Sequence, residues 1–377
     1  MFQMNIKTLH KIELDYSADS VEWCPLPGSR QYFLCGTYEL EKNKENAAAN
    51  ETDEQLEAGE FNVDETPIRR KGRIYLFEYN SAENKLTQLD TVDTAAITDQ
   101  KWTVLRNDEA IFAASDSIGQ VELYKLNGEK LEKISTVAEP EIKDYLALSL
   151  DWNPETEANR QIISSDSKGG ITLYQLNESN VDTIRKWNAH SYEAWISVFD
   201  KWNPNVVYTG GDDMRLRGYD LRAEGNNDAP LETLLNKSHF AGITVVYTLA
   251  SNENIVATGS YDEYFRAFDK RRFNKPIAEL KLTGGLWRMK SDPFEHKHVA
   301  CCCMYDNFTI LELDKAWSDP KVVAEYYEHK NICYSADWCH QLNQENDSMI
   351  MATCSFYDKL LCVSSVSSSV KEQASDN

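Results

Sequence analysis

One short pattern recurs along this chain and limits what it can fold into. Its clearest copy is Val207–Arg222, VYTGGDDMRLRGYDLR, where an alternating β-branched segment, a turn of Gly and Asp, and a second alternating segment follow one another. A second copy, Ile255–Arg271, has the same form with Phe268-Asp269 in place of Tyr219-Asp220. One hairpin would be weak evidence, but its repetition predicts a modular all-β fold.

Looser copies bring the total to seven. They are Gly72–Tyr79, Ile111–Leu126, Ile162–Leu176, His298–Leu313 and Met349–Val363. The same position in each copy holds a ring or an aliphatic side chain: Phe77, Tyr124, Tyr174, Tyr219, Phe268, Leu311 and Val363. The intervals of roughly 43 to 52 residues are close to the ~40–45 of blades that carry the Trp-Asp signature, with loop insertions. The chain is therefore predicted to be all-β, a seven-bladed WD-repeat β-propeller.

The two ends of the chain suggest how the ring closes. Ile6–Leu14 alternates like a strand, and we predict that it forms the outer strand of the last blade. We expect one propeller over residues 1–363 and a disordered tail over 364–377. Residues 41–70, rich in Glu, Asp, Asn and Ala, are expected to form a disordered acidic insertion in blade 1, or alternatively an acidic arm for a basic partner.

Composition narrows the function classes. The formal net charge of −22 argues against binding to the phosphate backbone of nucleic acid. The nine cysteines form no CxxC pair and no zinc-ligand spacing, so we predict buried, reduced thiols and no metal. No run is long enough to span a membrane, and no apolar signal core is present at the N-terminus. We expect a cytoplasmic protein without membrane insertion.

Several polar residues have a structural role available to them. Asp213 and Asp262 each lie six residues before the ring of their repeat, at the position of the turn Asp in such blades. His190 and His239 occupy the position of the loop His, which bonds within the blade. Both a structural and a functional interpretation stay open for these two histidines.

Other polar and aromatic residues have no such role and gather on two kinds of loop at one end of the ring. The loops before the inner strands contain Tyr192, Glu193, Trp195, Trp287, Arg288, His329 and Tyr334. The loops between second and third strands contain Asp212, Tyr261, Glu263, Phe356 and Tyr357. The simplest interpretation is the rim of a protein-binding surface. No nucleophile elbow, HExxH, P-loop or dinucleotide fingerprint accompanies it.

Longer stretches resemble one specific family. The matching segments are Ala147–Trp152 (ALSLDW), Ile162–Ser167 (IISSDS), Glu193-Ala194-Trp195, Tyr208–Asp213 (YTGGDD), Ala257–Glu263 (ATGSYDE), Gly284–Arg288 (GGLWR), Ala336–Trp338 (ADW) and Ala352–Asp358 (ATCSFYD). Together they resemble the WD-repeat proteins of diphthamide biosynthesis called diphthine methyl ester hydrolases, formerly diphthine methyltransferases. The resemblance covers about blades three to seven.

The resemblance implies a substrate and a reaction. The substrate would be elongation factor 2 carrying methylated diphthine on one histidine. The reaction would be hydrolysis of the methyl ester to diphthine and methanol by a carboxylic ester hydrolase without a cofactor. The alternative is a non-catalytic scaffold, for example in endosomal recycling of membrane proteins, with other WD-repeat or trafficking proteins as partners and possible association with endosomes.

The candidate residues can be fitted to that chemistry as a hypothesis. Diphthine carries a trimethylammonium group, which suits an aromatic cage. Candidates for substrate binding are Trp195, Tyr261, Glu263, Trp287, Tyr334 and Tyr357. Candidates for catalysis are His190, Glu193, Asp212, His239, Arg288 and Asp337. In this scheme a histidine, oriented by Asp212 or Asp337, activates water, and Arg288 stabilises the oxyanion.

Overall fold

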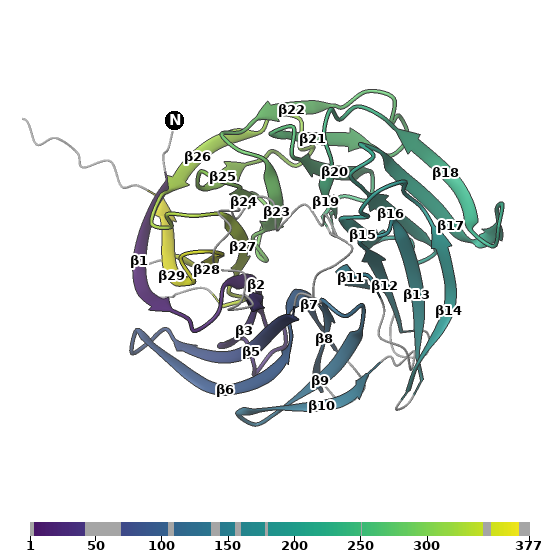
Figure 1. Ribbon diagram of the computed structural model, residues 1–377. Coiled ribbons are helices and arrows are strands. Elements are labelled where there is room, and N and C mark those ends of the chain that lie inside the picture. Colours follow the sequence, from purple (N-terminus) through teal and green to yellow (C-terminus); the bar gives the residue numbers. More distant parts are fainter. Residues whose placement is uncertain are drawn as a thin grey trace, which may run out of the picture.

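The computed structural model describes residues 4–41, 69–104, 109–136, 144–154, 160–177, 180–249, 251–341 and 348–368. These residues form seven antiparallel sheets arranged around a common axis (Figure 1). No helix occurs in the described ranges, so none there could cross a membrane. The structure confirms the predicted seven-bladed propeller.

The strand bounds follow one scheme in each blade, from the axis outward. Blade 1 comprises β2 (Ala18–Trp23), β3 (Tyr32–Thr37), β5 (Arg69–Asn80) and β6 (Lys85–Ala95), with β4 (Glu39–Glu41) paired to β5. Blade 2 comprises β7 (Ile97–Val104), β8 (Ala110–Asp116), β9 (Val121–Asn127) and β10 (Lys130–Thr136). Blade 3 comprises β11 (Ala147–Trp152), β12 (Gln161–Asp166), β13 (Gly170–Asn177) and β14 (Asn180–Asn188). Blade 4 comprises β15 (Ile196–Phe199), β16 (Val206–Gly210), β17 (Leu216–Glu224) and β18 (Pro230–Asn236).

The remaining three blades follow the same order. Blade 5 comprises β19 (Ile243–Thr248), β20 (Ile255–Ser260), β21 (Tyr264–Asp269) and β22 (Ala278–Lys281). Blade 6 comprises β23 (Leu286–Ser291), β24 (His298–Cys303), β25 (Phe308–Glu312) and β26 (Lys321–Tyr326). Blade 7 comprises β27 (Cys333–Trp338), β28 (Met349–Ser355), β29 (Leu360–Ser368) and β1 (Met4–Glu13).

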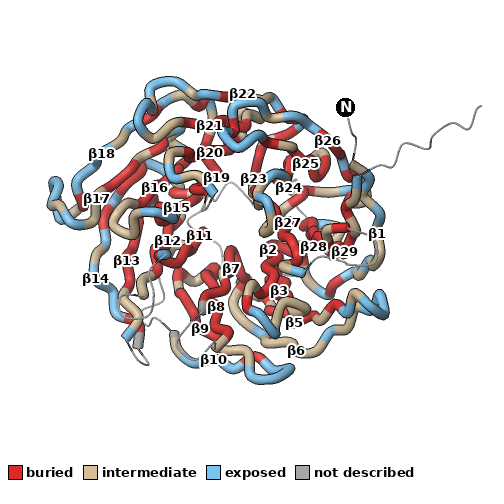
Figure 2. Tube along the Cα trace, turned by 180° about the vertical axis from the view of Figure 1, so that it is seen from behind, coloured by how far each residue is buried: buried red, intermediate tan, exposed pale blue. Residues whose placement is uncertain are grey.

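The repeated position found in the sequence is a core position of every blade. It falls on the third strand each time, and all seven side chains are buried: Phe77, Tyr124, Tyr174, Tyr219, Phe268, Leu311 and Val363. In Figure 2 the buried residues run through the inner and middle strands of the ring, while exposed residues predominate at its periphery. The core is therefore divided among the interfaces between blades, each filled by side chains of two neighbouring sheets.

The N-terminal strand closes the ring as predicted. β1 pairs antiparallel with β29 from Met4↔Ser368 to Glu13↔Leu360, and the two strands lie side by side in Figure 1. β29 continues to Ser368, past the predicted boundary at residue 363. The predicted acidic insertion and most of the predicted tail lie outside the described residues, which omit 42–68 and 369–377.

Carboxylates near the axis join three of the inner strands to the next blade. The backbone N–H of Trp23 donates to Asp337 at 2.6 Å, that of Leu150 to Asp99 at 3.2 Å, and that of Phe199 to Asp151 at 2.9 Å. Inner strands of neighbouring blades share no sheet, so these side chains satisfy backbone donors that would otherwise lack a partner. Asp337, a predicted catalytic residue, has this structural role.

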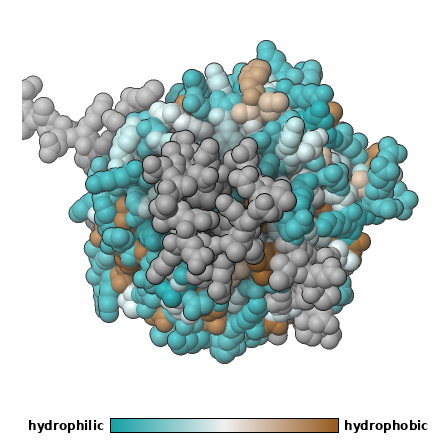
Figure 3. Space-filling model, viewed as in Figure 1, coloured by the Kyte–Doolittle hydropathy of each residue, from teal (hydrophilic) through white to brown (hydrophobic). Residues whose placement is uncertain are grey.

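Surface and cysteines agree with the composition. The described residues on the face shown in Figure 3 are mostly hydrophilic, in keeping with the large net charge. All nine cysteines are free and buried, as predicted. Burial raises the pKa of the Cys301, Cys302 and Cys354 thiols well above the usual value, so these groups stay protonated and unreactive.

Candidate functional site

A bulge recurs at the start of the inner strands. In six blades the pairing of the inner strand shifts by one residue at its second position, and the displaced residues are Asp19, Thr98, Leu148, Thr244, Trp287 and Tyr334. Only β15 pairs with its neighbour without a shift among the described inner strands. A β-bulge re-aims a side chain out of the regular sheet. Five of these six residues line one cavity near the axis of the ring.

The cavity has a volume of about 430 Å³. All seven blades contribute to its lining. Blade 4 does so only through the loop before its first strand, which contains Glu193 and Trp195. The other lining residues are Asp19, Tyr38, Leu40, Arg70, Thr98, Asp144, Leu146, Leu148, Ser167, Lys168, Tyr261, Trp287, Arg288, Met304, Tyr334, Phe356 and Tyr357. A cavity of this size, apolar on one side with a few convergent polar groups, suits a small ligand or one modified side chain.

One side of the cavity is a continuous row of rings, which we call the aromatic wall: Tyr38, Trp195, Tyr261, Trp287, Tyr334, Phe356 and Tyr357. Ring centroids lie 5.5 Å apart for Trp195 and Trp287, and 5.3 Å apart for Trp287 and Tyr334. Tyr334 stacks on Phe356 at 4.8 Å. Aromatic faces have negative electrostatic potential, so this wall can hold an organic cation.

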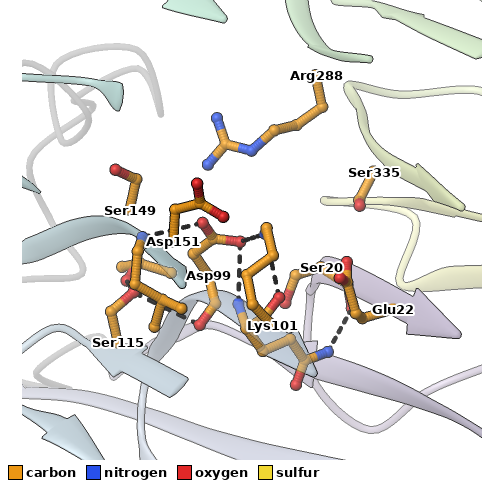
Figure 4. A network of polar contacts seen from close by, with 12 residues as sticks. Ser20, Glu22, Asp99, Lys101, Ser115, Ser149, Asp151, Arg288 and Ser335 are labelled. Atoms are coloured by element: carbon orange, nitrogen blue, oxygen red, sulfur yellow. Dashed lines mark hydrogen bonds and ion pairs between the residues drawn. The ribbon is translucent and has the colours of Figure 1, made fainter. Parts of the chain in front are cut away.

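The polar side of the cavity centres on Arg288. Its guanidinium lies 4.9 Å from the Trp287 ring, and its Nη1 donates to the Trp287 carbonyl at 3.3 Å. Figure 4 shows the side chain extending from β23 toward Asp99 and Asp151, which belong to a second cavity of about 270 Å³ along the axis. Arg288 lines both cavities, whereas the other basic residues of the first cavity, Arg70 and Lys168, line that cavity alone.

The structure brings together seven of the twelve predicted site residues. Glu193, Trp195, Tyr261, Trp287, Arg288, Tyr334 and Tyr357 line the cavity. Asp212 does not line it but supports it, because it accepts a hydrogen bond from Trp195 Nε1 at 3.1 Å. Glu263 pairs with Lys281 at 3.2 Å, outside the cavity lining. The aromatic half of the predicted site is thus assembled from five different loops and strands.

The two predicted catalytic histidines are held inside their blades. His190 bonds through Nδ1 to Asp213 at 2.8 Å and through Nε2 to Thr209 at 2.9 Å. His239 bonds to Asp262 at 3.1 Å and to Thr258 at 2.7 Å in the same arrangement. Both are buried, and neither lines the cavity. These contacts match the structural interpretation of the loop His.

The sequence places His329 on the rim without a structural partner, and this prediction is wrong. Its Nδ1 bonds to Ser355 at 2.5 Å and its Nε2 to Thr353 at 2.8 Å, which repeats the network of the other two histidines with Ser355 in the acceptor place of the turn Asp. The sequence comparison did not reveal this network because the turn Asp of blade 7 is Asp358, which does not bond to the histidine directly. Asp358 instead accepts a hydrogen bond from Ser355 at 2.5 Å.

The burial of His329 predicts a pH dependence of stability. Burial lowers the pKa of His329 from 6.5 to about 4. As the pH falls below 6.5, His329 becomes protonated in the unfolded chain but stays neutral in the folded chain. The free energy of unfolding therefore decreases between pH 6.5 and about 4. From pH 7 to 5 this group should cost about 2 kcal/mol. Urea unfolding at both pH values should show a smaller pH effect in His329→Asn than in wild type; equal effects would contradict the assignment.

Sequence reasoning missed Asp19, Thr98 and the basic residues Arg70 and Lys168 of the cavity. A signal for Asp19 was present. Aligning the inner strands ADSVEW and LWRMKS places Asp19 at the position of Trp287. That position is the bulge of the inner strand. The repeats were recognised by their turns and third strands, so the inner-strand positions were not compared. Among the described residues no group of three or more His, Cys, Asp or Glu could hold a metal ion.

The fold and this cavity define a class: a seven-bladed WD-repeat propeller with a cavity lined by aromatic side chains near its axis. A chain in the crystal structure of the mitotic checkpoint complex shares the fold, with a TM-score of 0.65 over 97% of this chain and 93% of that chain at 13% identity. No family model matches the sequence.

Curated relatives define the class further. The chain is 35% identical to diphthine methyltransferase of Homo sapiens, over 89% of this chain and 75% of the relative. It is 34% identical to diphthine methyltransferase of Mus musculus, over 88% and 69%. Its identity to the diphthine methyltransferase homolog of Dictyostelium discoideum is 32%, over 93% and 96%. The chain belongs to the diphthine methyltransferase family.

The names of these relatives correct one prediction. They describe methyltransferases, whereas we predicted a carboxylic ester hydrolase, so that assignment of enzyme class is withdrawn. The names support an enzyme of diphthamide biosynthesis. They give no support to the predicted alternative, a scaffold in endosomal recycling.

Proposed function

We propose that this protein acts on the diphthine side chain of elongation factor 2 and changes its state of methylation during diphthamide biosynthesis. The observation that supports the proposal best is the aromatic wall beside Arg288. Diphthine presents a trimethylammonium group and a carboxyl group close together. A cavity that places a guanidinium beside a row of rings matches that pair.

The physical basis is the difference between the two halves of the ligand. A quaternary ammonium has no N–H to donate, so rings rather than hydrogen-bond acceptors recognise it, at about 0.5–2 kcal/mol per favourable ring contact. A carboxyl group instead takes the planar fork of an arginine. Because Trp287 and Arg288 are consecutive on β23, one strand presents both kinds of contact.

A folded protein substrate also needs a docking surface around the cavity. Exposed apolar side chains follow the loops of blades 4 to 7 on the cavity side, and we call them the rim crescent: Tyr192, Met214, Phe240, Tyr305, Tyr327 and Tyr357. Phe240 is 79% exposed and Tyr305 is 69% exposed. Met214 and Tyr305 have positive φ angles of 62° and 61°, which large side chains rarely adopt. Such exposed aromatic groups typically mark a protein-binding surface.

Substitutions in the rim crescent should separate docking from chemistry. Phe240→Ala is expected to raise the KM for intact elongation factor 2 about tenfold, as for a central interface aromatic, with kcat little changed. The matched control is Ile184→Ala, an exposed apolar residue on the outer strand β14. Steady-state kinetics on both variants check this. Equal KM values in Phe240→Ala and wild type would remove the crescent from the interface.

Mass spectrometry of elongation factor 2 tests the proposed function itself. The factor from cells lacking this protein should carry an intermediate instead of diphthamide. Adding the purified chain, together with a low-molecular-weight filtrate of cell extract, should change the methyl content of that intermediate. Normal diphthamide in the deletion cells, or no mass change on addition, would refute the proposal.

A further inference from the structure

Asp19 is a buried carboxyl group that forms no hydrogen bond within the part of the chain that the structure describes. Only 8% of the residue is exposed, and its side chain lines the cavity from the bulge of β2. No hydrogen bond or ion pair joins its carboxyl to any other described residue, unlike the inner-strand carboxylates Asp99, Asp151 and Asp337, which bind backbone N–H groups. Buried carboxyl groups normally have hydrogen-bond partners, so an unpartnered one that faces a cavity suggests a ligand.

Charged and titratable groups from several elements face Asp19. Arg288 on β23 attracts the carboxylate, Asp99 on β7 repels it, and the Cys354 thiol lies nearby on β28. The cavity also holds the charged side chains Arg70, Asp144, Lys168 and Glu193. Asp19 thus shares the cavity with Arg288 and with the aromatic wall, which contains Trp287 and Tyr334 at the bulges equivalent to its own.

We propose that Asp19 is the anionic partner of a quaternary ammonium bound against the aromatic wall, while Arg288 takes the carboxylate of the same ligand. The inference deepens the proposed function, on which it rests for the natural ligand. It assigns to Asp19 the charge complementarity that we expected from Glu193 or Glu263, of which Glu193 lines the cavity and Glu263 does not.

The assignment has a thermodynamic consequence. Burial raises the pKa of Asp19 well above its usual value, so the carboxyl is neutral over a wider pH range than an exposed one. A permanent cation stabilises the ionised form and lowers that pKa. Binding therefore expels a proton, and affinity should rise with pH by up to tenfold per unit until the free carboxyl ionises by itself.

Two small probes separate charge from shape. Glycine betaine has the trimethylammonium and the carboxylate, and 3,3-dimethylbutanoate is its uncharged-head isostere with the same carboxylate. Titration calorimetry on the full chain should show that betaine binds more tightly as pH rises and releases a proton, whereas dimethylbutanoate does neither. No detectable betaine binding at millimolar concentration would overturn the inference.

Asp19→Asn is the decisive variant. It should lower the affinity for betaine at least tenfold and remove the pH dependence of betaine binding. The affinity for dimethylbutanoate should equal that of wild type. Asp93→Asn, a mostly exposed acid on the outer strand β6 of the same blade and outside both cavities, is the matched control, and its affinity for betaine should stay within twofold of wild type. Should Asp19→Asn fail to fold in a thermal melt, Asp19→Ser takes its place. Equal loss of both probes, or no loss of betaine, would refute the role of Asp19.

The two proposals can fail separately. If betaine binding depends on Asp19 but diphthine on elongation factor 2 is unchanged, the site stands and the proposed function falls. If the methylation of diphthine changes but betaine binding is the same in Asp19→Asn and wild type, only the inference about Asp19 is refuted.

Discussion

Arg288→Gln should lower the rate of diphthine conversion on the order of 100-fold while leaving the propeller folded. Arg288 is half-buried on β23, lines both cavities and lies next to Asp19 and Asp99. Removing the charged partner of a desolvated group costs about 2–5 kcal/mol. Glutamine retains a donor and a similar length but not the charge or the fork, so the carboxyl of the substrate loses its main anchor.

The measurement is kcat/KM on elongation factor 2 from cells lacking this protein, read by mass spectrometry. The matched control is Arg271→Gln, because Arg271 is an exposed arginine paired with Asp269 outside the cavity and should keep full activity. Thermal melts confirm that both variants are folded. Activity of Arg288→Gln within a few fold of wild type would exclude this cavity as the reaction site.

Most of the fold could be predicted because its information is local and repeated. A ring at Phe77 or Tyr219 marks the third strand of a blade whatever the loops around it do, so insertions change the spacing without hiding the pattern. Ring closure by β1 followed from counting strands, since the C-terminal segment supplies only three for blade 7. Strand ends were predicted less well, and β29 extends past the expected end of the domain.

The site was only half predictable because it depends on register rather than on residue type. The aromatic wall comes from segments with many aromatic residues, which can be recognised in the sequence. Trp287 and Tyr334, which we expected in loops, lie in strands β23 and β27. In the sequence, nothing distinguishes Asp19 from the many other acidic residues. Its place in the cavity depends on the bulge of β2. A bulge shows only when two paired strands are compared residue by residue, and a single sequence contains no such pairing. The same limit applied to His329, whose partners Thr353 and Ser355 are set by the turn of blade 7.

Deleting residues 1–13 should destabilise the propeller more than any single substitution on its surface. Nine residues of β1 pair with β29 on the two sides of a register shift between Thr8 and His10, and Ile6 and Ile12 pack against the buried clusters of blade 7. β1 also reaches blade 6, through Thr8 to Tyr326 at 2.8 Å and Lys11 to Glu328 at 2.7 Å. With about 1 kcal/mol net for each hydrogen bond lost, the cost is on the order of 5–10 kcal/mol.

Such a loss equals much of the ~5–15 kcal/mol by which a typical domain is stable, so we expect the Tm to fall by roughly 10 °C or more. The deletion also exposes β29 as a free edge, which promotes aggregation. A synthetic peptide of residues 1–13 should restore the Tm by pairing with that edge, and a scrambled peptide of the same composition should not. A truncated chain that melts like the full one would show that blade 7 holds the ring closed with three strands, and that β1 covers an edge without locking the propeller.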